Sequence, residues 1–513
     1  MNRGTPKILT KLPVILTGIY ICIFLSLLIC TVFTNAPREL RDAANVAAAQ
    51  RLAHMQNPYI LDVNQHFIEY INVYPPLNML LAAFLHLLTG SNLYKVFYAL
   101  DFIYIVITAT VIACFIKKNF NTSLFVTLLS FSASLTLGWR TGFISTVPDH
   151  LGMLICIILL LCVHKNKSIL LQAVLSILAF YSKQYFLAIA ATVFLFYCLR
   201  NKITALKYFL YTAAIGISSF IIICIVCPSF SVQILYFMFA ENDSMNISKI
   251  LYSVKQIFLV FTTYAFYSLF TFKKYILGLK KLIADKRVDT TVFDLNNILM
   301  FFVLLYLGTN KGAFLSYHLT LLMPCIIITG SVELDNFLKK LTYKRKLSLT
   351  FFICIGSLAL LLKKYQLPYV YTEKDYSQYV HIENILEQYK KHEVYLVSQL
   401  GYYALEHSKA LAENGHHDYI ISLSESHIIN TSIDINESSR LFPYIRDLYK
   451  YSLLRKEEIL DSIDKQEFAL ITRQNGNTML YGYDIRTKYV CIDSIPIRTG
   501  TQNYTVDLWV PKE

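Results

Sequence analysis

Two carboxylates, Glu39 and Asp42, lie three residues apart in the stretch TNAPRELRDAANVAAAQRLAHMQNPY, residues 34–59. In an alanine-rich helix this spacing places both acids on one face. The stretch begins where a hydrophobic run ends, so the acids are expected at a membrane surface. There an aspartate can act as a general base toward a hydroxyl group. The alternative is that Arg38 pairs with Asp42 at i,i+4 and that the acids only mark the boundary between lipid and water.

Other side chains suited to anion binding or proton transfer are expected on the same membrane face. They are Arg140, Asp149, Lys183, Lys311, Tyr317 and His318. Some have an ordinary structural explanation, such as helix capping for Asp149 and snorkelling to the interface for Lys183. Lys183 lies in a three-residue turn between two apolar segments, where solvation alone explains a cation poorly. Together these residues are suited to an anionic lipid head group beside a carboxylate base.

The elements that must position these residues are membrane spans. The chain has 513 residues, of which 55% are hydrophobic and 16% are charged, and its mean hydropathy is +0.46. Soluble domains carry about 25% charged residues. Residues 13–33 form an unbroken apolar run of about the ~20 residues that a bilayer crossing needs. The run is too long for a signal-peptide core and lacks a small-residue cleavage site, so we predict an uncleaved first span.

The net charge of +13 is distributed in short loops between the apolar runs. The Lys and Arg clusters lie at 117–118, 165–167, 200–207, 273–287 and 339–346. This is the positive-inside pattern, which predicts a cytoplasmic N-terminus. No basic face is accompanied by a nucleic-acid reading motif, so a nucleic-acid partner is not expected. No His, Cys and Asp cluster has metal-ligand spacing, so no metal is expected, although Asp42 and Asp149 could share a divalent cation.

Reading the apolar runs between basic loops predicts an α-helical polytopic membrane protein with about eleven transmembrane helices. The predicted spans are 13–34, 94–116, 121–138, 150–164, 168–182, 184–199, 207–227, 256–273, 296–309, 316–331 and 347–363. The segment 75–90 opens with two prolines, closes with glycine and is short for a span. Counting it as a crossing would move every later basic loop to the outer face. It is therefore assigned to the first outer loop, residues 35–93, as a juxtamembrane or re-entrant helix.

After the last predicted span the composition becomes polar. Residues 1–364 are expected to form the transmembrane module, and residues 365–513 an extracytoplasmic α/β domain. In that domain the strand-like segments VYLVS and YIISL alternate with the helix-like segments LGYYALEHSKAL and KEEILDSID.

The order of several motifs resembles the C-type (GT-C) membrane glycosyltransferases. An acid and an Ala-rich helix are followed by NPY (57–59) and by YPPL (74–77), which opens an apolar helix. The later motifs are PDHLGMLICIILLL, LAFYSKQYFLAIAATVFLF and GTNKGAFLSYHLTLLMPCIII, so the likeness covers roughly residues 13–331. Two positions depart from the family pattern. Ala43 follows Asp42 where paired acids are frequent, and Gln56 precedes NPY where glycine is usual.

The resemblance implies transfer of a sugar from a polyprenyl-phosphate donor to an acceptor hydroxyl on the outer face, with inversion. Asp42 would be the base, with Glu39 as the second acid. Lys183, Arg140 and Lys311 would hold the lipid phosphate, and Asp149 would orient the acceptor or an arginine. The acceptor would be a glycan, lipid or protein of the cell envelope, no cofactor is needed, and the location would be the bilayer of a bacterial inner membrane. Tyr317 and His318 would line the substrate site from the later loop.

Two other classes would use similar residues. A transporter or lipid-linked sugar flippase could bind an anionic lipid through the same charges, but the sequence has no repeats and no charged or Gly/Pro-broken helices at mid-membrane in both halves. A polysaccharide polymerase or ligase would be expected to place its key residues in a large later loop, whereas here the acids concentrate in the first loop.

Overall fold

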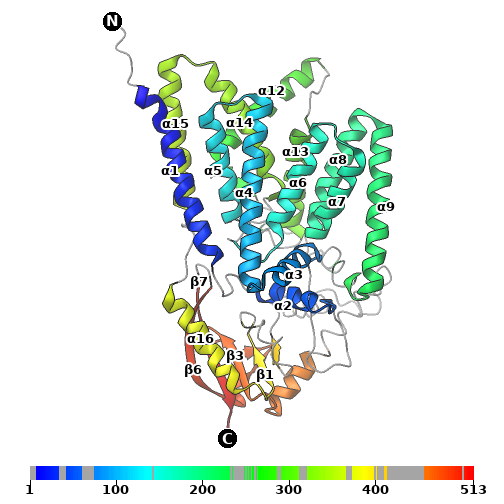
Figure 1. The fold of residues 1–513 in the computed structure, drawn as a ribbon, viewed down its shortest axis with the longest axis vertical. Helices are drawn as coiled ribbons and strands as arrows, with labels where there is room; N and C mark the ends of the chain where they lie inside the picture. The colour runs from blue at the N-terminus through cyan, green and yellow to red at the C-terminus, as the bar shows by residue number, and fades with distance from the viewer. Residues whose placement is uncertain are drawn as a thin grey trace.

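Long helices packed side by side form most of the molecule, and a small sheet lies beyond one end of them (Figure 1). The computed structural model describes residues 7–33, 42–59, 74–140, 144–231, 264–285, 291–310, 320–364, 372–397, 410–412, 456–499 and 502–513, with single residues at 400, 454 and between 234 and 262. The bundle helices are α1 (Lys7–Val32), α4 (Leu93–Phe120), α5 (Leu124–Arg140), α6 (Asp149–His164), α7 (Ile169–Ser182), α8 (Leu187–Arg200), α9 (Lys202–Val226), α12 (Ala265–Asp285), α13 (Val292–Asn310), α14 (Met323–Lys339) and α15 (Tyr343–Lys364).

Each of the predicted spans overlaps one of these helices. Among the described residues, three helical segments are long and apolar enough to cross a bilayer by themselves: Lys11–Val32, Leu93–Phe120 and Lys202–Val226. Others are apolar but shorter, such as Asp149–His164 and Ile169–Ser182. The mostly helical class, with helices apolar and long enough to cross a membrane, is therefore confirmed, while the count of eleven crossings stays a prediction.

Helix boundaries follow the local sequence. Asn201 caps α9, because its side chain accepts hydrogen bonds from the backbone N–H groups of Ile203 and Thr204 at 3.0 and 3.1 Å. The short helix α3 (Leu77–Thr89) starts after two prolines and ends at Gly90, whose φ of 63° lies in the left-handed region that glycine adopts without strain.

The bundle is held together by close backbone approach as well as by apolar packing. α4 packs against α5, α6 against α7, and α12 against α14. A Cβ atom added at Gly330 in α14 would lie 2.3 Å from the carbonyl oxygen of Tyr267 in α12, so these two helices touch through their backbones. Small residues at helix contacts are typical of membrane bundles, in which packing rather than the hydrophobic effect drives association.

The two ends of the bundle differ in character. The turns that join α4 to α5, α6 to α7, α8 to α9 and α14 to α15 lie at one end, and the basic clusters lie in these turns or in the helix ends beside them (Figure 1). At this end Lys339 donates to the carbonyl of Asn121 at 3.0 Å, and the backbone N–H of Ser123 donates to Asp335 at 2.9 Å. The opposite end, here called the α2/α3 end, is covered by α2 (Asp42–Ala53) and α3.

The segment 75–90 forms α3 and packs against α2 rather than running beside the long helices (Figure 1). Its 13 residues extend about 20 Å at 1.5 Å per residue, which is short of the ~30 Å hydrocarbon core. This geometry suits the juxtamembrane position that the sequence predicts.

The C-terminal region contains a five-stranded sheet with strand order β2-β1-β3-β7-β6. Its elements are α16 (Glu373–Gln388), β1 (Val394–Leu396), β2 (Ala410–Ala412), β3 (Leu470–Gln474), β4 (Met479–Leu480), β5 (Tyr483–Asp484), η4 (Ile485–Thr487), β6 (Tyr489–Thr499) and β7 (Gln502–Pro511). β1 is parallel to β2 and β3, whereas β7 is antiparallel to β3 and β6. Figure 1 shows α2 and α3 between this sheet and the bundle.

The predicted strand in VYLVS and the predicted helix in KEEILDSID are confirmed, as β1 and as helical residues 456–464. The helix predicted for LGYYALEHSKAL is wrong at its end, where Ala410–Ala412 form β2 and pair with β1. A strand of three residues is too short to show a periodic pattern in the sequence, and it forms because it pairs with a neighbouring strand. The segment YIISL lies outside the described residues.

Candidate active site

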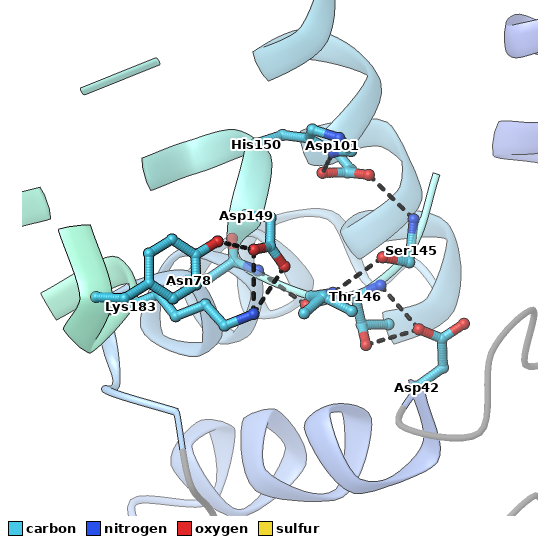
Figure 2. Close-up of polar contacts among 10 residues, drawn as sticks. Asp42, Asn78, Asp101, Ser145, Thr146, Asp149, His150 and Lys183 are labelled. Atoms are coloured by element: carbon cyan, nitrogen blue, oxygen red, sulfur yellow. Dashed lines mark hydrogen bonds and ion pairs between the residues drawn. The ribbon is translucent and has the colours of Figure 1, made fainter. Parts of the chain in front are cut away.

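Asp42 is the first residue of α2, and its carboxylate is completely buried. Its Oδ1 accepts hydrogen bonds from the backbone N–H and the hydroxyl of Thr146, at 2.9 and 2.8 Å. Its Oδ2 accepts a hydrogen bond from the hydroxyl of Tyr98 in α4 at 2.9 Å. A carboxylate at a helix N-terminus is also favoured by the helix dipole. These contacts hold Asp42 in one orientation at the α2/α3 end, and Figure 2 shows the two that come from Thr146.

Thr146 is the residue through which α2 and α3 reach the loop before α6. Its hydroxyl accepts a hydrogen bond from Asn45 in α2 at 3.0 Å, and its carbonyl accepts one from Asn78 in α3 at 3.0 Å. All three side chains are buried. The two helices that cover the end of the bundle are therefore tied to the same short loop segment.

Asp149 and Lys183 form a buried ion pair beside this loop. The Lys183 Nζ lies 3.0 Å from each carboxylate oxygen of Asp149, and the two residues are 5% and 2% exposed. The Tyr185 hydroxyl also donates to Asp149. The ammonium group lies 4.8 Å from the ring centroid of Tyr74 and 5.1 Å from that of Tyr185, within cation–π range.

The ordinary explanations for these two residues do not hold. Pro148 occupies the N-cap position of α6 without a side-chain cap, so Asp149 is not the N-cap but the first helical residue. Lys183 ends α7 in an extended conformation (φ −158°, ψ 137°) and points to Asp149 instead of to a polar surface.

The turn around Lys183 requires a glycine, Gly152, on the facing side of α6. A Cβ atom added at Gly152 would lie 1.9 Å from Cε2 of Phe186. Phe186 belongs to the short helix η1 (Gln184–Phe186) that follows Lys183, and its ring is fully buried. Glycine at 152 thus lets η1 approach α6, and this approach brings Lys183 and Tyr185 to Asp149.

A second buried polar pair lies next to the first. The Nδ1 of His150 lies 2.6 Å from Oδ1 of Asp101 in α4, and the backbone N–H of Ser145 donates to Oδ2 of Asp101 at 3.0 Å. Asp101, Ser145 and His150 are 3%, 3% and 1% exposed. Figure 2 shows the Asp101–His150 pair above the Asp149–Lys183 pair, with Asp42 on the other side of Thr146.

The NPY and YPPL motifs meet in space. The Tyr59 hydroxyl donates to the carbonyl of Tyr74 at 2.8 Å, and the Asn57 side chain accepts from the backbone N–H of Tyr59 at 2.9 Å. Burial raises the pKa of the Tyr59 phenol well above its usual value, so Tyr59 stays a neutral donor. The hydrogen bond to its carbonyl holds Tyr74 in place, and the Tyr74 ring lies against the Lys183 ammonium group.

Three of the predicted site residues, Asp42, Asp149 and Lys183, are thus brought together, and their roles stay predictions. Arg140 is the last residue of α5, and its side chain is not described. The other predicted site residues lie outside the described residues: Glu39, Lys311, Tyr317 and His318. Arg38, the partner in the alternative explanation of Asp42, also lies outside them.

Several residues of the cluster were missed by sequence reasoning: Asn45, Asn78, Tyr98, Asp101, Ser145, Thr146, His150 and Tyr185. A signal existed for Asp101, because it is an acid within the apolar segment LYKVFYALDFIYIVITATV, and intramembrane acids are functional candidates by default. His150 directly follows Asp149. The hydroxyl and amide residues carry no such signal.

The cluster offers an oriented carboxylate, a lysine ammonium group held by Asp149 and several neutral donors, all of them buried and grouped around residues 145–150. That combination can accept a proton at one point and bind negative charge at another. In the part of the chain that the structure describes, no group of three or more His, Cys, Asp or Glu side chains gathers at metal-binding distance.

No family model matches the sequence, and a search of curated proteins finds no match. Among solved structures, the chain is similar to the oligosaccharyltransferase of Archaeoglobus fulgidus, with a TM-score of 0.52 and 8% identity over 90% of this chain and 70% of that chain. ArnT from Cupriavidus metallidurans gives a TM-score of 0.50 and 10% identity over 96% of this chain and 97% of that chain. Both structures are GT-C glycosyltransferases. This chain has the GT-C fold.

The likeness to ArnT extends over nearly the whole of both chains, so it takes in most of the C-terminal region as well as the bundle. A third similar structure is the archaeal AglB from Archaeoglobus fulgidus in complex with an inhibitory peptide and a dolichol-phosphate, with a TM-score of 0.50, 10% identity and coverage of 90% of this chain and 69% of that chain. The family expected from the order of motifs is therefore the family whose fold the chain has.

Proposed function

We propose that this chain is a glycosyltransferase that moves a sugar from a polyprenyl-phosphate donor to an acceptor hydroxyl on the extracytoplasmic face of a membrane, with inversion. One observation carries the proposal. Asp42 is bonded to Thr146, and Lys183 is paired with Asp149 three residues further along the same buried segment, at the α2/α3 end of a GT-C fold. An oriented carboxylate and a cation next to each other are what base-assisted attack on a phosphate-linked sugar needs.

The orientation of the site is supported by the distribution of charge. The basic turns lie at the end of the bundle opposite to α2 and α3 (Figure 1). Under the positive-inside rule, the end with the basic turns is cytoplasmic and the α2/α3 end is extracytoplasmic. A bacterial inner membrane, with the sugar delivered on a lipid to the outer face, is the location that we propose.

In the proposed reaction, the acceptor hydroxyl oxygen attacks the anomeric carbon as the bond from that carbon to the phosphate oxygen breaks. The hydroxyl proton passes to Asp42, and the bonding electrons leave with the phosphate. Lys183 stabilises the negative charge that develops on the phosphate. A lysine ammonium has three N–H donors, so it can bind Asp149 and a phosphate oxygen together. Because Asp42 is completely buried, entry of the acceptor requires part of its cover to move.

No metal ion or other cofactor is part of this proposal. Asp149 takes the role of holding Lys183 in place, which is closer to the geometry than the acceptor-orienting role expected from the resemblance. The donor lipid is proposed as a polyprenyl phosphate because AglB, a structure of the same fold, is in complex with a dolichol-phosphate.

The test compares Asp42→Asn with Asp461→Asn. Asp42→Asn preserves size but removes the base, so sugar transfer should fall by at least the ~10²-fold that a general base contributes. Binding of a short-chain polyprenyl phosphate should be retained. Asp461 is exposed and paired with Lys465 far from the cluster, so the same substitution there controls for general effects. Transfer by Asp42→Asn at the wild-type rate would exclude Asp42 as the base.

A further inference from the structure

Asp101 is an acid inside the helical segment Leu93–Phe120, which is apolar and long enough to cross a bilayer. An ionisable side chain in such a segment is costly and is kept where it has a task. The mechanism above does not use Asp101. Its partners are Ser145, in the loop before α6, and His150, in the first turn of α6.

The loop between these two anchors contains the contacts of the site. Thr146, directly after Ser145, donates two hydrogen bonds to Asp42. Asp149, directly before His150, forms the ion pair with Lys183. One carboxylate in α4 therefore fixes the start and the end of residues 145–150, and between those points the loop presents a donor to the base and a carboxylate to the cation (Figure 2).

We propose that Asp101 is a positioning residue that acts on Asp42 through Ser145 and Thr146, and that His150 serves as a hydrogen-bond donor to Asp101 and not as a carrier of the acceptor's proton. The inference rests on the proposed function. Asp101 touches no reacting atom in this scheme. It fixes the position of residues 145–150, and the orientation of Asp42 depends on its hydrogen bonds to Thr146 in that segment.

Asp101→Asn is the perturbation that the geometry singles out. The carboxylate accepts N–H groups at both oxygens, whereas an amide offers one acceptor oxygen and turns an NH₂ group toward the other donor. One anchor is then lost, and the loop shifts. A misplacement of about 1 Å in a catalytic constellation costs about 100-fold in rate. We expect kcat to fall by about 10- to 100-fold, with a smaller change in the KM for the donor.

A double-mutant cycle separates positioning from general damage. Thr146→Val removes the hydroxyl donor to Asp42 but leaves the backbone donor in place. If Asp101 acts through Thr146, the double variant Asp101→Asn/Thr146→Val loses less activity than the product of the two single losses, since both act on one contact. If Asp101 only stabilises the fold, the two losses multiply.

His150 is tested with two substitutions that differ in one respect. In His150→Asn the side-chain NH₂ group can take the place of the Nδ1–H donor, whereas His150→Leu has no donor. We expect His150→Asn to keep transfer within about 3-fold of the wild type, and His150→Leu to lose as much as Asp101→Asn. Equal, severe loss in both variants would mean that the imidazole itself carries a proton, which overturns the role proposed for His150.

The experiment uses the full-length protein in lipid nanodiscs. A panel of radiolabelled polyprenyl-phosphate monosaccharides serves as donor, and membranes from cells lacking the protein supply the acceptor. Non-additive loss in the cycle supports the inference, and multiplicative loss overturns it. If Asp42→Asn is inactive while Asp101→Asn is as fast as the wild type, the positioning role fails and the proposed function stands. If the wild type transfers no sugar from any donor, the proposed function fails and the inference fails with it.

Discussion

The Asp149–Lys183 pair allows stability and function to be separated by charge-removing substitutions. Lys183→Met preserves the length of the side chain but leaves the buried carboxylate of Asp149, which also accepts a hydrogen bond from Tyr185, without its cation. Asp149→Asn leaves a buried ammonium group between two tyrosine rings. Breaking a buried ion pair by removal of one partner costs about 3–5 kcal/mol, mostly because the other charge is left uncompensated.

The double variant Lys183→Met/Asp149→Asn leaves no unpaired charge. Replacement of both partners of a buried pair by neutral residues of similar volume is often close to neutral. The double variant should therefore be more stable than either single variant, by at least about 2 kcal/mol. Lys183 is also the proposed phosphate ligand, so all three variants should bind polyprenyl phosphate more weakly than the wild type. Two of them lack the lysine, and in Asp149→Asn the lysine is no longer held in place.

Two measurements in the same detergent test whether Lys183 binds phosphate as well as neutralising Asp149. They are thermal unfolding and binding of a short-chain polyprenyl phosphate. The expected result is that the double variant recovers thermal stability without recovering binding. Recovery of both together would refute the reasoning, because Lys183 would then serve only to neutralise Asp149. Additive destabilisation in the double variant would refute the charge-compensation argument.

Three further predictions concern packing, topology and the C-terminal region. Gly152→Ala should destabilise the protein by about 1–3 kcal/mol in a thermal unfolding assay, because the added Cβ meets the Phe186 ring, and Phe186→Leu should partly compensate. The control is Gly18→Ala, where no atom lies within 4 Å of the added Cβ, and it should be neutral or stabilising in the same assay. An epitope inserted at 165–167 should be protected in intact spheroplasts, whereas one after Glu513 should be accessible to antibody, and the reverse pattern would overturn the orientation of the site. Removal of residues 365–513 should leave the bundle folded by circular dichroism and gel filtration, because its helices satisfy their own backbone hydrogen bonds; collapse of the bundle would show that these residues are part of its core.

The sequence was sufficient to predict the helical class, the segments that form helices and three residues of the cluster. Long apolar runs determine their own secondary structure in lipid, where every backbone group must be bonded within the helix. Asp42, Asp149 and Lys183 stand out in the sequence because they lie on the predicted outer face: Asp42 follows the first span, Asp149 directly precedes the span 150–164, and Lys183 lies in a three-residue turn between two spans. The sequence placed them on one membrane face but did not show that they meet. Lys183 was expected to bind a phosphate, and in the structure it is held by Asp149.

Other features could not be predicted from one sequence, for physical reasons. The donor from Thr146 to Asp42 is partly a backbone N–H group, which has no signature in the residue types. Asp101 gave a signal by its position, but nothing in the spacing shows that its helix turns it toward His150, which is 49 residues away. Gly152 reads as an ordinary glycine of an apolar helix until the ring of Phe186 is seen against it.

The most direct test of the central claim is the fate of the donor lipid when the wild-type protein, in proteoliposomes, meets a radiolabelled polyprenyl-phosphate monosaccharide and an acceptor membrane fraction. The account predicts that free polyprenyl phosphate appears together with an equal amount of glycosylated acceptor of inverted anomeric configuration. It also predicts that neither product appears with Asp42→Asn. A donor that crosses the bilayer with its sugar–phosphate bond intact, at equal rates in both proteins, would contradict the account and identify a lipid-linked sugar transporter instead.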